Sequence, residues 1–133
     1  MADVTITTIS LDSGSNYVVT GKLYGEAVGL GDWVYLKSTD NAWWLADCLA
    51  TGTAVVAGQA LVAGATGDYG VIAIPGAKVD YGSGLVVGAY ILSEAGGMAP
   101  VVDLAALDYI SILGVAESTS VFAINVFNSG IIK

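Results

Sequence analysis

The stretch Tyr109-Ile110-Ser111-Ile112-Leu113-Gly114-Val115-Ala116 is followed by Glu117-Ser118-Thr119-Ser120 and then by Val121-Phe122-Ala123-Ile124-Asn125-Val126-Phe127. Two runs of β-branched and aromatic residues around a short polar segment are typical of a β-hairpin. The second run is apolar on both of its alternating faces, and strands that are buried on both sides have this pattern. We therefore expect a final strand buried on both faces, with either the domain itself or a neighbouring subunit supplying the second cover.

The rest of the chain predicts the same kind of element in shorter pieces. Glycine makes up 18 of the 133 residues, and it permits the positive φ angles that tight hairpin turns need. Short apolar runs meet glycine-centred turns at residues 26–36, 54–62 and 85–92, and no helical apolar period persists for three turns. The sequence predicts an all-β, barrel-like or sandwich-like domain of short strands and glycine turns, over residues 21–133.

Two regularities within this domain suggest different architectures. Residues 36–47 can be laid over residues 92–103 without a gap, which indicates a diverged internal duplication. A glycine also falls at every sixth position from Gly52 to Gly88, a spacing typical of parallel β-helices, whose inward column is expected here at Leu49, Val55, Leu61, Val79, Leu85 and Ile91. Gly67 and Ala73 interrupt that column, so we favour short strands with glycine turns.

Residues 1–20 differ from the remainder, because apolar residues are set singly among Thr, Ser and Asp. We interpret them as an extended N-terminal arm whose apolar positions contact a partner: Val4, Ile6, Ile9 and Leu11. Such a segment can add a strand to the exposed sheet edge of another protein. The alternative is an ordinary first strand of the domain itself.

Composition excludes several classes of function. Four Lys and Arg against twelve Asp and Glu give a net charge of −8, so we expect no nucleic-acid partner. The longest uncharged stretch is interrupted by glycine and polar residues, and we expect no membrane span. The high apolar content, 55% of the residues, predicts assembly with other subunits, because a domain of this size leaves much apolar surface outside.

The chain also lacks the residues of common catalytic and metal sites. With no His and one Cys, a Ser-His-Asp triad and the usual zinc, haem and iron–sulfur ligand sets cannot form. We expect Cys48 to be a packed thiol. Carboxylates alone can hydrolyse glycosides, but the candidates lie mostly beside turn residues, where Asp binds nearby backbone: Asp32, Asp40, Asp47, Asp68, Asp80 and Glu94. We predict no catalytic residue, no metal, no cofactor and no small-molecule substrate.

Aromatic residues gather around a predicted turn at residues 38–41. Trp43 and Trp44 are adjacent, so on a strand they point to opposite faces, and one of them is expected to leave the sheet's own core. Packing across the hairpin is the favoured interpretation of this cluster, a protein contact is the next, and sugar stacking the last. The candidate interface residues are Trp33, Trp43, Trp44, Phe122 and Phe127.

The run Gly25-Glu26-Ala27-Val28, followed by Gly31-Asp32-Trp33-Val34-Tyr35-Leu36 and later by Asp108-Tyr109-Ile110 and Leu113-Gly114-Val115-Ala116, resembles the head decoration, or cement, proteins of tailed bacteriophages. The resemblance covers roughly residues 21–128. It implies a small β-rich homotrimer without enzyme activity that docks on the capsid exterior and clamps neighbouring major capsid proteins. It implies assembly in the host cytoplasm and a place on the virion, with the N-terminal arm contributing to capsid binding.

Trp43 and Trp44 match no pattern of that family, and their role stays open. The alternative function is a carbohydrate- or surface-binding β module of a phage tail or fibre, acting through exposed aromatic side chains. A third and less favoured alternative is a small glycosidase that uses two carboxylates.

Overall fold

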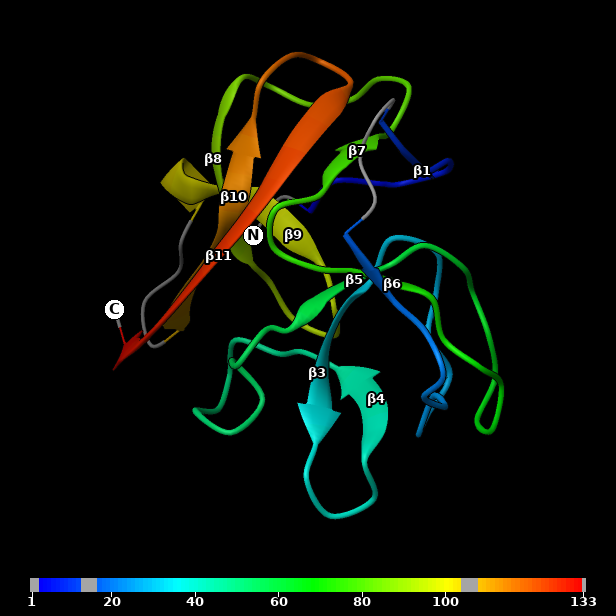
Figure 1. The fold of residues 1–133 in the computed structure, drawn as a ribbon. Coiled ribbons are helices and arrows are strands. Elements are labelled where there is room, and N and C mark those ends of the chain that lie inside the picture. Colours follow the sequence, from blue (N-terminus) through cyan, green and yellow to red (C-terminus); the bar gives the residue numbers. More distant parts are fainter. Residues whose placement is uncertain (1–2, 13–16, 104–107, 133) are drawn as a thin grey trace.

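The computed structural model describes residues 3–12, 17–103 and 108–132 of the chain. These residues form two antiparallel β-sheets and a short 3₁₀ helix, η1 (Val101–Asp103), with no α-helix (Figure 1). The predicted all-β class is confirmed. The first sheet has six strands, in the order β1 (Ser10–Leu11), β7 (Lys78–Asp80), β11 (Val121–Ile132), β10 (Tyr109–Ala116), β8 (Gly88–Leu92) and β9 (Met98–Pro100). The second has five, in the order β2 (Val18–Val19), β6 (Ile72–Ala73), β5 (Gly58–Ala60), β3 (Trp33–Lys37) and β4 (Ala42–Leu45).

The two sheets repeat one topology. In the five-stranded sheet, β2 lies beside β6, β6 beside β5, β5 beside β3, and β3 beside β4. The six-stranded sheet arranges β7, β11, β10, β8 and β9 in the same way and adds β1 at its edge. Each half of the chain therefore contributes one sheet of the same design.

The strand register supports this duplication. Trp33 pairs with Gln59 in the five-stranded sheet, and Ala89 pairs with Val115 in the six-stranded sheet. Ala89 follows Trp33 in the chain by the same number of residues as Val115 follows Gln59. Residues 92–103 follow residues 36–47 by that same number. The internal duplication indicated by the sequence is therefore present in the strand pairing.

A glycine occupies the same place in both halves for a steric reason. A Cβ atom at Gly58 would run into the backbone oxygen of Ala73, and one at Gly114 would run into the backbone oxygen of Ala123. Gly114 also lies at a β-bulge and has a φ of 151°. The close approach of the neighbouring strand therefore requires glycine at both positions.

The column of every sixth residue does not form one inward face. Leu49 and Val55 are 57% and 52% exposed, whereas Val79, Leu85 and Ile91 are buried. The β-helix alternative is not what the chain adopts, and the preference for short strands with glycine turns is confirmed.

Two apolar clusters stabilise the domain. The larger one lies between the sheets, where the Phe122 ring contacts Trp33 edge-on at 5.9 Å and stacks on Tyr81 at 6.1 Å. The smaller one lies on the opposite face of the five-stranded sheet and includes Val34 and Trp43. Burial of large aromatic and aliphatic side chains on both faces of this sheet is the main stabilising term.

The described part of the predicted arm is built into the domain. The Val4 amide donates a 2.8 Å hydrogen bond to the Met98 carbonyl, and the Thr8 hydroxyl donates to the Tyr81 carbonyl. β1 then pairs with β7. Residues 1–2 and 13–16 of the predicted arm lie outside the described residues. Of the two interpretations of this segment, the ordinary first strand describes residues 10 and 11.

Candidate functional site

The four apolar residues predicted to contact a capsid are half-buried against the core between the sheets: Val4, Ile6, Ile9 and Leu11. Ile6 lies close against Gly31, where its side chain would meet any added Cβ. These side chains reach the surface only in part, so their first contact is with their own domain.

The five predicted interface aromatics divide into buried and surface groups. Trp33, Trp43 and Phe122 are 0%, 3% and 0% exposed and belong to the core. Phe127 is 61% exposed, and Trp44 is half-buried. The expectation that Trp43 and Trp44 point to opposite sides is confirmed, because only Trp43 belongs to a core cluster.

Trp44 is held at the surface by two neighbours that sequence reasoning missed. Its indole Nε1 donates a 2.9 Å hydrogen bond to Asp40 Oδ2, and the Lys37 Nζ lies 4.2 Å from its ring centroid. Tyr35 pairs with Trp44, and Lys37 lies two residues after Tyr35 on the same strand. The alternation of side chains along β3 was therefore the signal that could have placed Lys37 on the same face as Trp44, diagonal to it.

The domain itself does not bury both faces of the final strand, and cover of the second face by a neighbouring subunit stays a prediction. Phe122 and Ile124 face the core, but Asn125 and Phe127 are exposed. β7 pairs with β11 only over Val121–Ala123. No other sheet of this chain lies on the outer side within the described residues, so the second apolar face is open.

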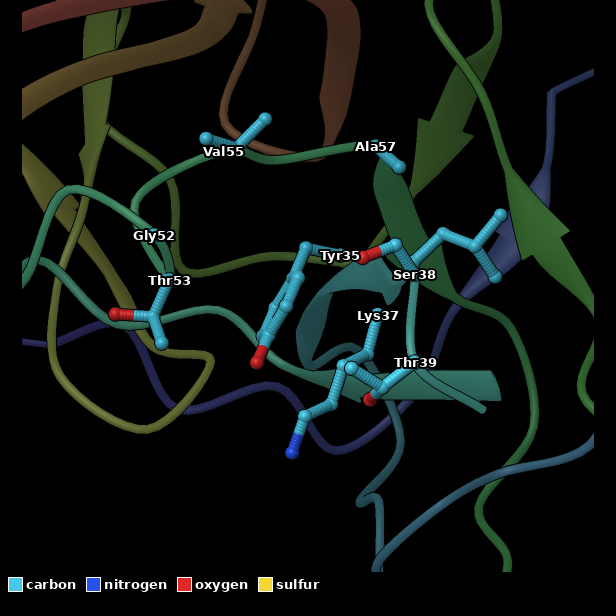
Figure 2. Close-up of a pocket in the computed structure, with 9 residues that line it drawn as sticks. Tyr35, Lys37, Ser38, Thr39, Gly52, Thr53, Val55 and Ala57 are labelled. Atoms are coloured by element: carbon cyan, nitrogen blue, oxygen red, sulfur yellow. The ribbon is translucent and has the colours of Figure 1, made fainter. Parts of the chain in front are cut away.

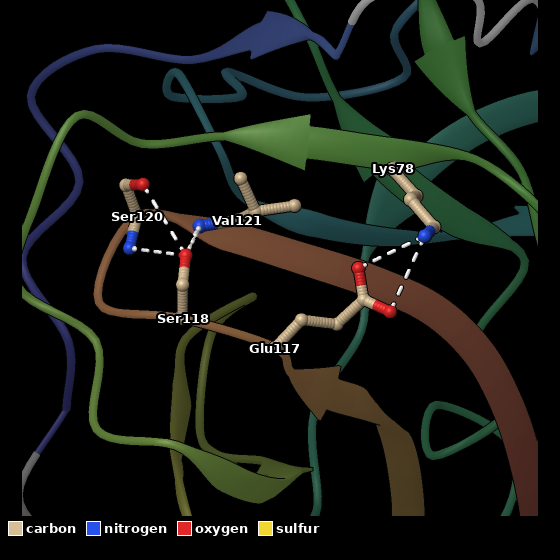
Figure 3. Close-up of polar contacts among 5 residues, drawn as sticks. All are labelled: Lys78, Glu117, Ser118, Ser120 and Val121. Carbon is tan, nitrogen blue, oxygen red and sulfur yellow. Dashed lines mark hydrogen bonds and ion pairs between the residues drawn. The ribbon is translucent and has the colours of Figure 1, made fainter.

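The turn that leads into β11 is fixed by polar contacts (Figure 3). The Ser118 hydroxyl accepts hydrogen bonds from the amides of Ser120 and Val121, at 3.3 and 3.1 Å. Lys78 Nζ lies 3.0 Å from Glu117 Oε1, and this ion pair joins β7 to the end of β10. Both side chains are about half exposed, so the pair contributes little to stability.

The carboxylates that could have served catalysis bind turns. Asp40, Asp47 and Asp80 each accept a hydrogen bond from the amide two residues ahead. Asp32 and Asp68 accept from the amides of residues 29 and 65, three positions behind them. The turn interpretation is confirmed for these five residues. Burial raises the pKa of Asp32 against the opposing effect of its hydrogen bond from Gly29.

Cys48 is fully buried, as predicted for a packed thiol. Burial, followed by the negative charge of Asp108, raises the pKa of this thiol to about 12. The thiol is therefore protonated at neutral pH and is a poor nucleophile.

An open cleft of about 550 Å³ lies beside the end of β3 and the turn of the β3–β4 hairpin (Figure 2). The Tyr35 ring points into it with the Lys37 side chain nearby, whereas the Thr53 hydroxyl points away from the ring and donates to the carbonyls of Asp47 and Ala50. Burial, the charge of Glu26 and the charge of Asp40, in that order, raise the pKa of Tyr35. The cleft therefore offers a neutral phenol ring near the Lys37 side chain, whose Nζ lies over the Trp44 ring.

A second, apolar cleft of about 220 Å³ lies between the segment that precedes β8 and helix η1. Four valines line it with exposed side chains, at 69%, 64%, 42% and 86%: Val86, Val87, Val101 and Val102. Sequence reasoning missed this patch. The signal was two pairs of adjacent valines, which lie outside the strands, in the segment before β8 and in η1.

Among residues 3–12, 17–103 and 108–132, no group of three or more Cys, Asp and Glu side chains is arranged to hold a metal ion. In the same part of the chain no helix has the length and apolar character needed to cross a membrane. Comparisons with models of protein families, with curated proteins and with solved structures each find no match to this chain.

Proposed function

We propose that this chain is a structural virion protein that decorates and stabilises the outside of a phage capsid. In this proposal it acts as a homotrimer that clamps neighbouring major capsid proteins, without enzyme activity or cofactor. The proposal rests on the resemblance of residues 21–128 to capsid decoration proteins and on one structural observation, the cleft of four exposed valines.

The valine cleft supports a lattice-binding role because of its chemistry. Contiguous exposed apolar side chains mark surfaces that bind other proteins. Here they occur in a chain with a net charge of −8, which keeps single molecules apart in solution. Apolar docking of many identical copies adds modest contacts by multivalency, which is how such a protein would resist internal pressure.

The N-terminal arm is a secondary capsid contact in this proposal, whereas the sequence led us to expect its apolar residues to bind the capsid directly. Val4, Ile6, Ile9 and Leu11 pack against their own core, so the arm can contact a capsid only through its exposed side or by leaving the edge of β7. The valine cleft is the primary candidate contact, and the arm is secondary.

Cosedimentation with undecorated capsids of the phage that encodes this chain tests the proposal. The wild-type protein is expected to pellet with capsids, and Val102→Ser is expected to reduce occupancy at least about tenfold, by loss of a buried apolar contact. Val62→Ser removes another exposed valine, at 38% exposure in the segment after β5, and is the matched control. Wild-type protein that stays in the supernatant would refute the capsid role.

One observation favours a second candidate, a carbohydrate-binding module of a tail or fibre. The Tyr35 cleft combines an aromatic ring with the polar groups of Lys37, Ser38 and Thr39, a combination suited to a sugar that stacks on the ring and whose hydroxyls accept a hydrogen bond from Lys37. Glycan-array binding that is lost in Tyr35→Ala and retained in Val102→Ser would favour this function over capsid decoration.

A further inference from the structure

The turn of the β8–β9 hairpin is bound by the five-stranded sheet. The Trp33 amide donates a 2.8 Å hydrogen bond to the Gly96 carbonyl, and the Gly96 amide donates to the Ala46 carbonyl at 2.6 Å. The Ala95 amide donates to Asp47 Oδ2 at 3.2 Å. Gly96 is buried, and a Cβ atom added to it would lie 3.0 Å from the nearest side chains. We call the residues that hold this turn the turn slot: Asp32, Trp33, Leu45, Ala46 and Asp47.

The internal duplication places the equivalent of the turn slot in the six-stranded sheet. In the five-stranded sheet, Val34 pairs with Gly58 on one side and Leu45 on the other. In the six-stranded sheet, Tyr90 pairs in the same way with Gly114 and Pro100, with one residue fewer between the paired strand positions of the hairpin. Counted from these pairs, the equivalents of the five slot residues, in the same order, are Gly88, Ala89, Pro100, Val101 and Val102. All five line the valine cleft of about 220 Å³.

We propose that the valine cleft receives a β-turn of the protein to which this chain binds. The inference rests on the proposed function, in which this cleft is the primary capsid contact, and it adds the kind of structure that enters. The equivalent slot is filled by a β-turn, and the cleft has the corresponding backbone positions around it. By register, the Ala89 amide takes the place of the Trp33 amide, so it donates to a carbonyl of the entering turn. Such main-chain hydrogen bonds supply affinity for a segment of many different sequences.

The side chains that differ between slot and cleft define which turn is accepted. Asp47 accepts a hydrogen bond from an amide in the slot, whereas its equivalent Val102 is apolar and 86% exposed. None of the residues that line the cleft is charged, so the entering turn brings an apolar side chain against the valines. Gly88 stands where the slot has Asp32, and this leaves room for a small side chain at the place that Gly96 takes in the slot.

The corresponding turn of this chain, at residues 38–41 of the β3–β4 hairpin, does not meet that description. Its Asp40 carboxylate accepts hydrogen bonds from Trp44 Nε1 and from the Ala42 amide, within its own hairpin. Bringing a carboxylate into an uncharged apolar cleft costs free energy. The occupant is therefore a turn of another protein, and occupation by a second copy is an outcome that the experiment detects.

NMR titration of the ¹⁵N-labelled full chain with a closed peptide tests the inference. The peptide carries residues 92–98 between two added cysteines joined by a disulfide, because this is the turn that fills the equivalent slot. We expect saturable shifts of the Ala89 and Val102 amide signals. The reduced and alkylated peptide is expected to bind at least about tenfold more weakly, since an open chain loses more conformational entropy on binding.

Two matched variants show whether binding occurs at the cleft. Val102→Lys places a charge in the cleft and is expected to lose the shifts. Val62→Lys makes the same change at a valine that is 38% exposed and lies outside the cleft, and it is expected to bind the closed peptide as the wild type does. No saturable shift in the wild type, or equal binding by the two variants, would overturn the inference.

Two further measurements separate this inference from the capsid role and from self-association. Self-association in analytical ultracentrifugation that is lost only in Val102→Lys would assign the cleft to a second copy and overturn the inference. Capsid cosedimentation is scored separately. A chain that binds the closed peptide but ignores capsids refutes only the capsid role, whereas capsid binding that is lost in Val102→Lys without any peptide binding keeps that role and overturns the turn-binding inference.

Discussion

The Tyr81 hydroxyl donates a 2.7 Å hydrogen bond to Oε1 of Gln59, and this bond joins the residue that follows β7 of the six-stranded sheet to β5 of the five-stranded sheet. Gln59 is fully buried, and its Nε2 donates a second hydrogen bond, of 2.9 Å, to the Gly31 carbonyl. Burial raises the pKa of Tyr81, so the phenol stays protonated and remains a donor. The two sheets are thus joined by a buried polar contact.

Removing this donor is expected to destabilise the fold. Tyr81→Phe leaves Gln59 Oε1 buried without that partner, at a cost of about 1–3 kcal/mol in the free energy of unfolding. Urea denaturation measures the change. Gln59→Leu and the double variant complete a cycle, and additive effects of the two substitutions would contradict a direct contact.

The two equivalent glycines are expected to tolerate no side chain. Gly58→Ala and Gly114→Ala each force the added Cβ against a backbone oxygen of the next strand, and we expect a loss of about 1–3 kcal/mol. Gly52 has no atom within 4 Å of an added Cβ, so Gly52→Ala is the control and should change stability by less than about 0.5 kcal/mol. Similar melting temperatures for all three variants would contradict the close strand approach.

The N-terminal segment is expected to contribute to stability. Ile6→Ala removes half-buried apolar area from the core edge and should cost about 1 kcal/mol, whereas Thr5→Ala, at an exposed position, should have no effect. Deletion of residues 1–12 removes β1 as well and should lower the melting temperature further. A deletion with an unchanged melting temperature would show that the segment is a free arm.

Cys48 is expected to make stability depend on alkaline pH. The pKa of Cys48 in the folded chain, about 12, lies above the ordinary thiol value of 9.0. The unfolded chain therefore loses this proton first, and the free energy of unfolding falls as the pH rises through that interval. The slope from one such group is about 1.4 kcal/mol per pH unit. The free energy of unfolding of Cys48→Ala should lack this contribution to its fall with pH. The pH profiles of the wild type and the variant should therefore differ by that amount. Rapid reaction of the native thiol with a thiol reagent at neutral pH would contradict its burial.

Part of the fold could be predicted from local patterns because the physics behind them is local. Alternating apolar residues and glycine turns specify short strands, and turn carboxylates bind amides two or three residues away. The match of residues 36–47 to residues 92–103 indicated the duplication for a related reason, since equivalent hairpins need similar residues at similar positions.

The surfaces could not be predicted in this way. Phe122 and Phe127 both lie in apolar surroundings in the sequence, yet one is at the centre of the core and the other is exposed. Val86 and Val102 form one cleft although they are remote in the chain. Neither result follows from a residue's neighbours in sequence.

The all-β class, the glycine turns, the packed thiol and the duplicated design could be inferred from the order of the residues. Which face of each sheet is covered depends on how the sheets pack against each other, and that packing is made by segments that are distant in the chain. The equivalent rows of paired residues in the two sheets differ for this reason. In the first half the row of Trp33, Gln59 and Ala73 is buried, because the six-stranded sheet packs on it. In the second half no further sheet among the described residues lies on the row of Ala89, Val115 and Ala123, and Val115 is exposed.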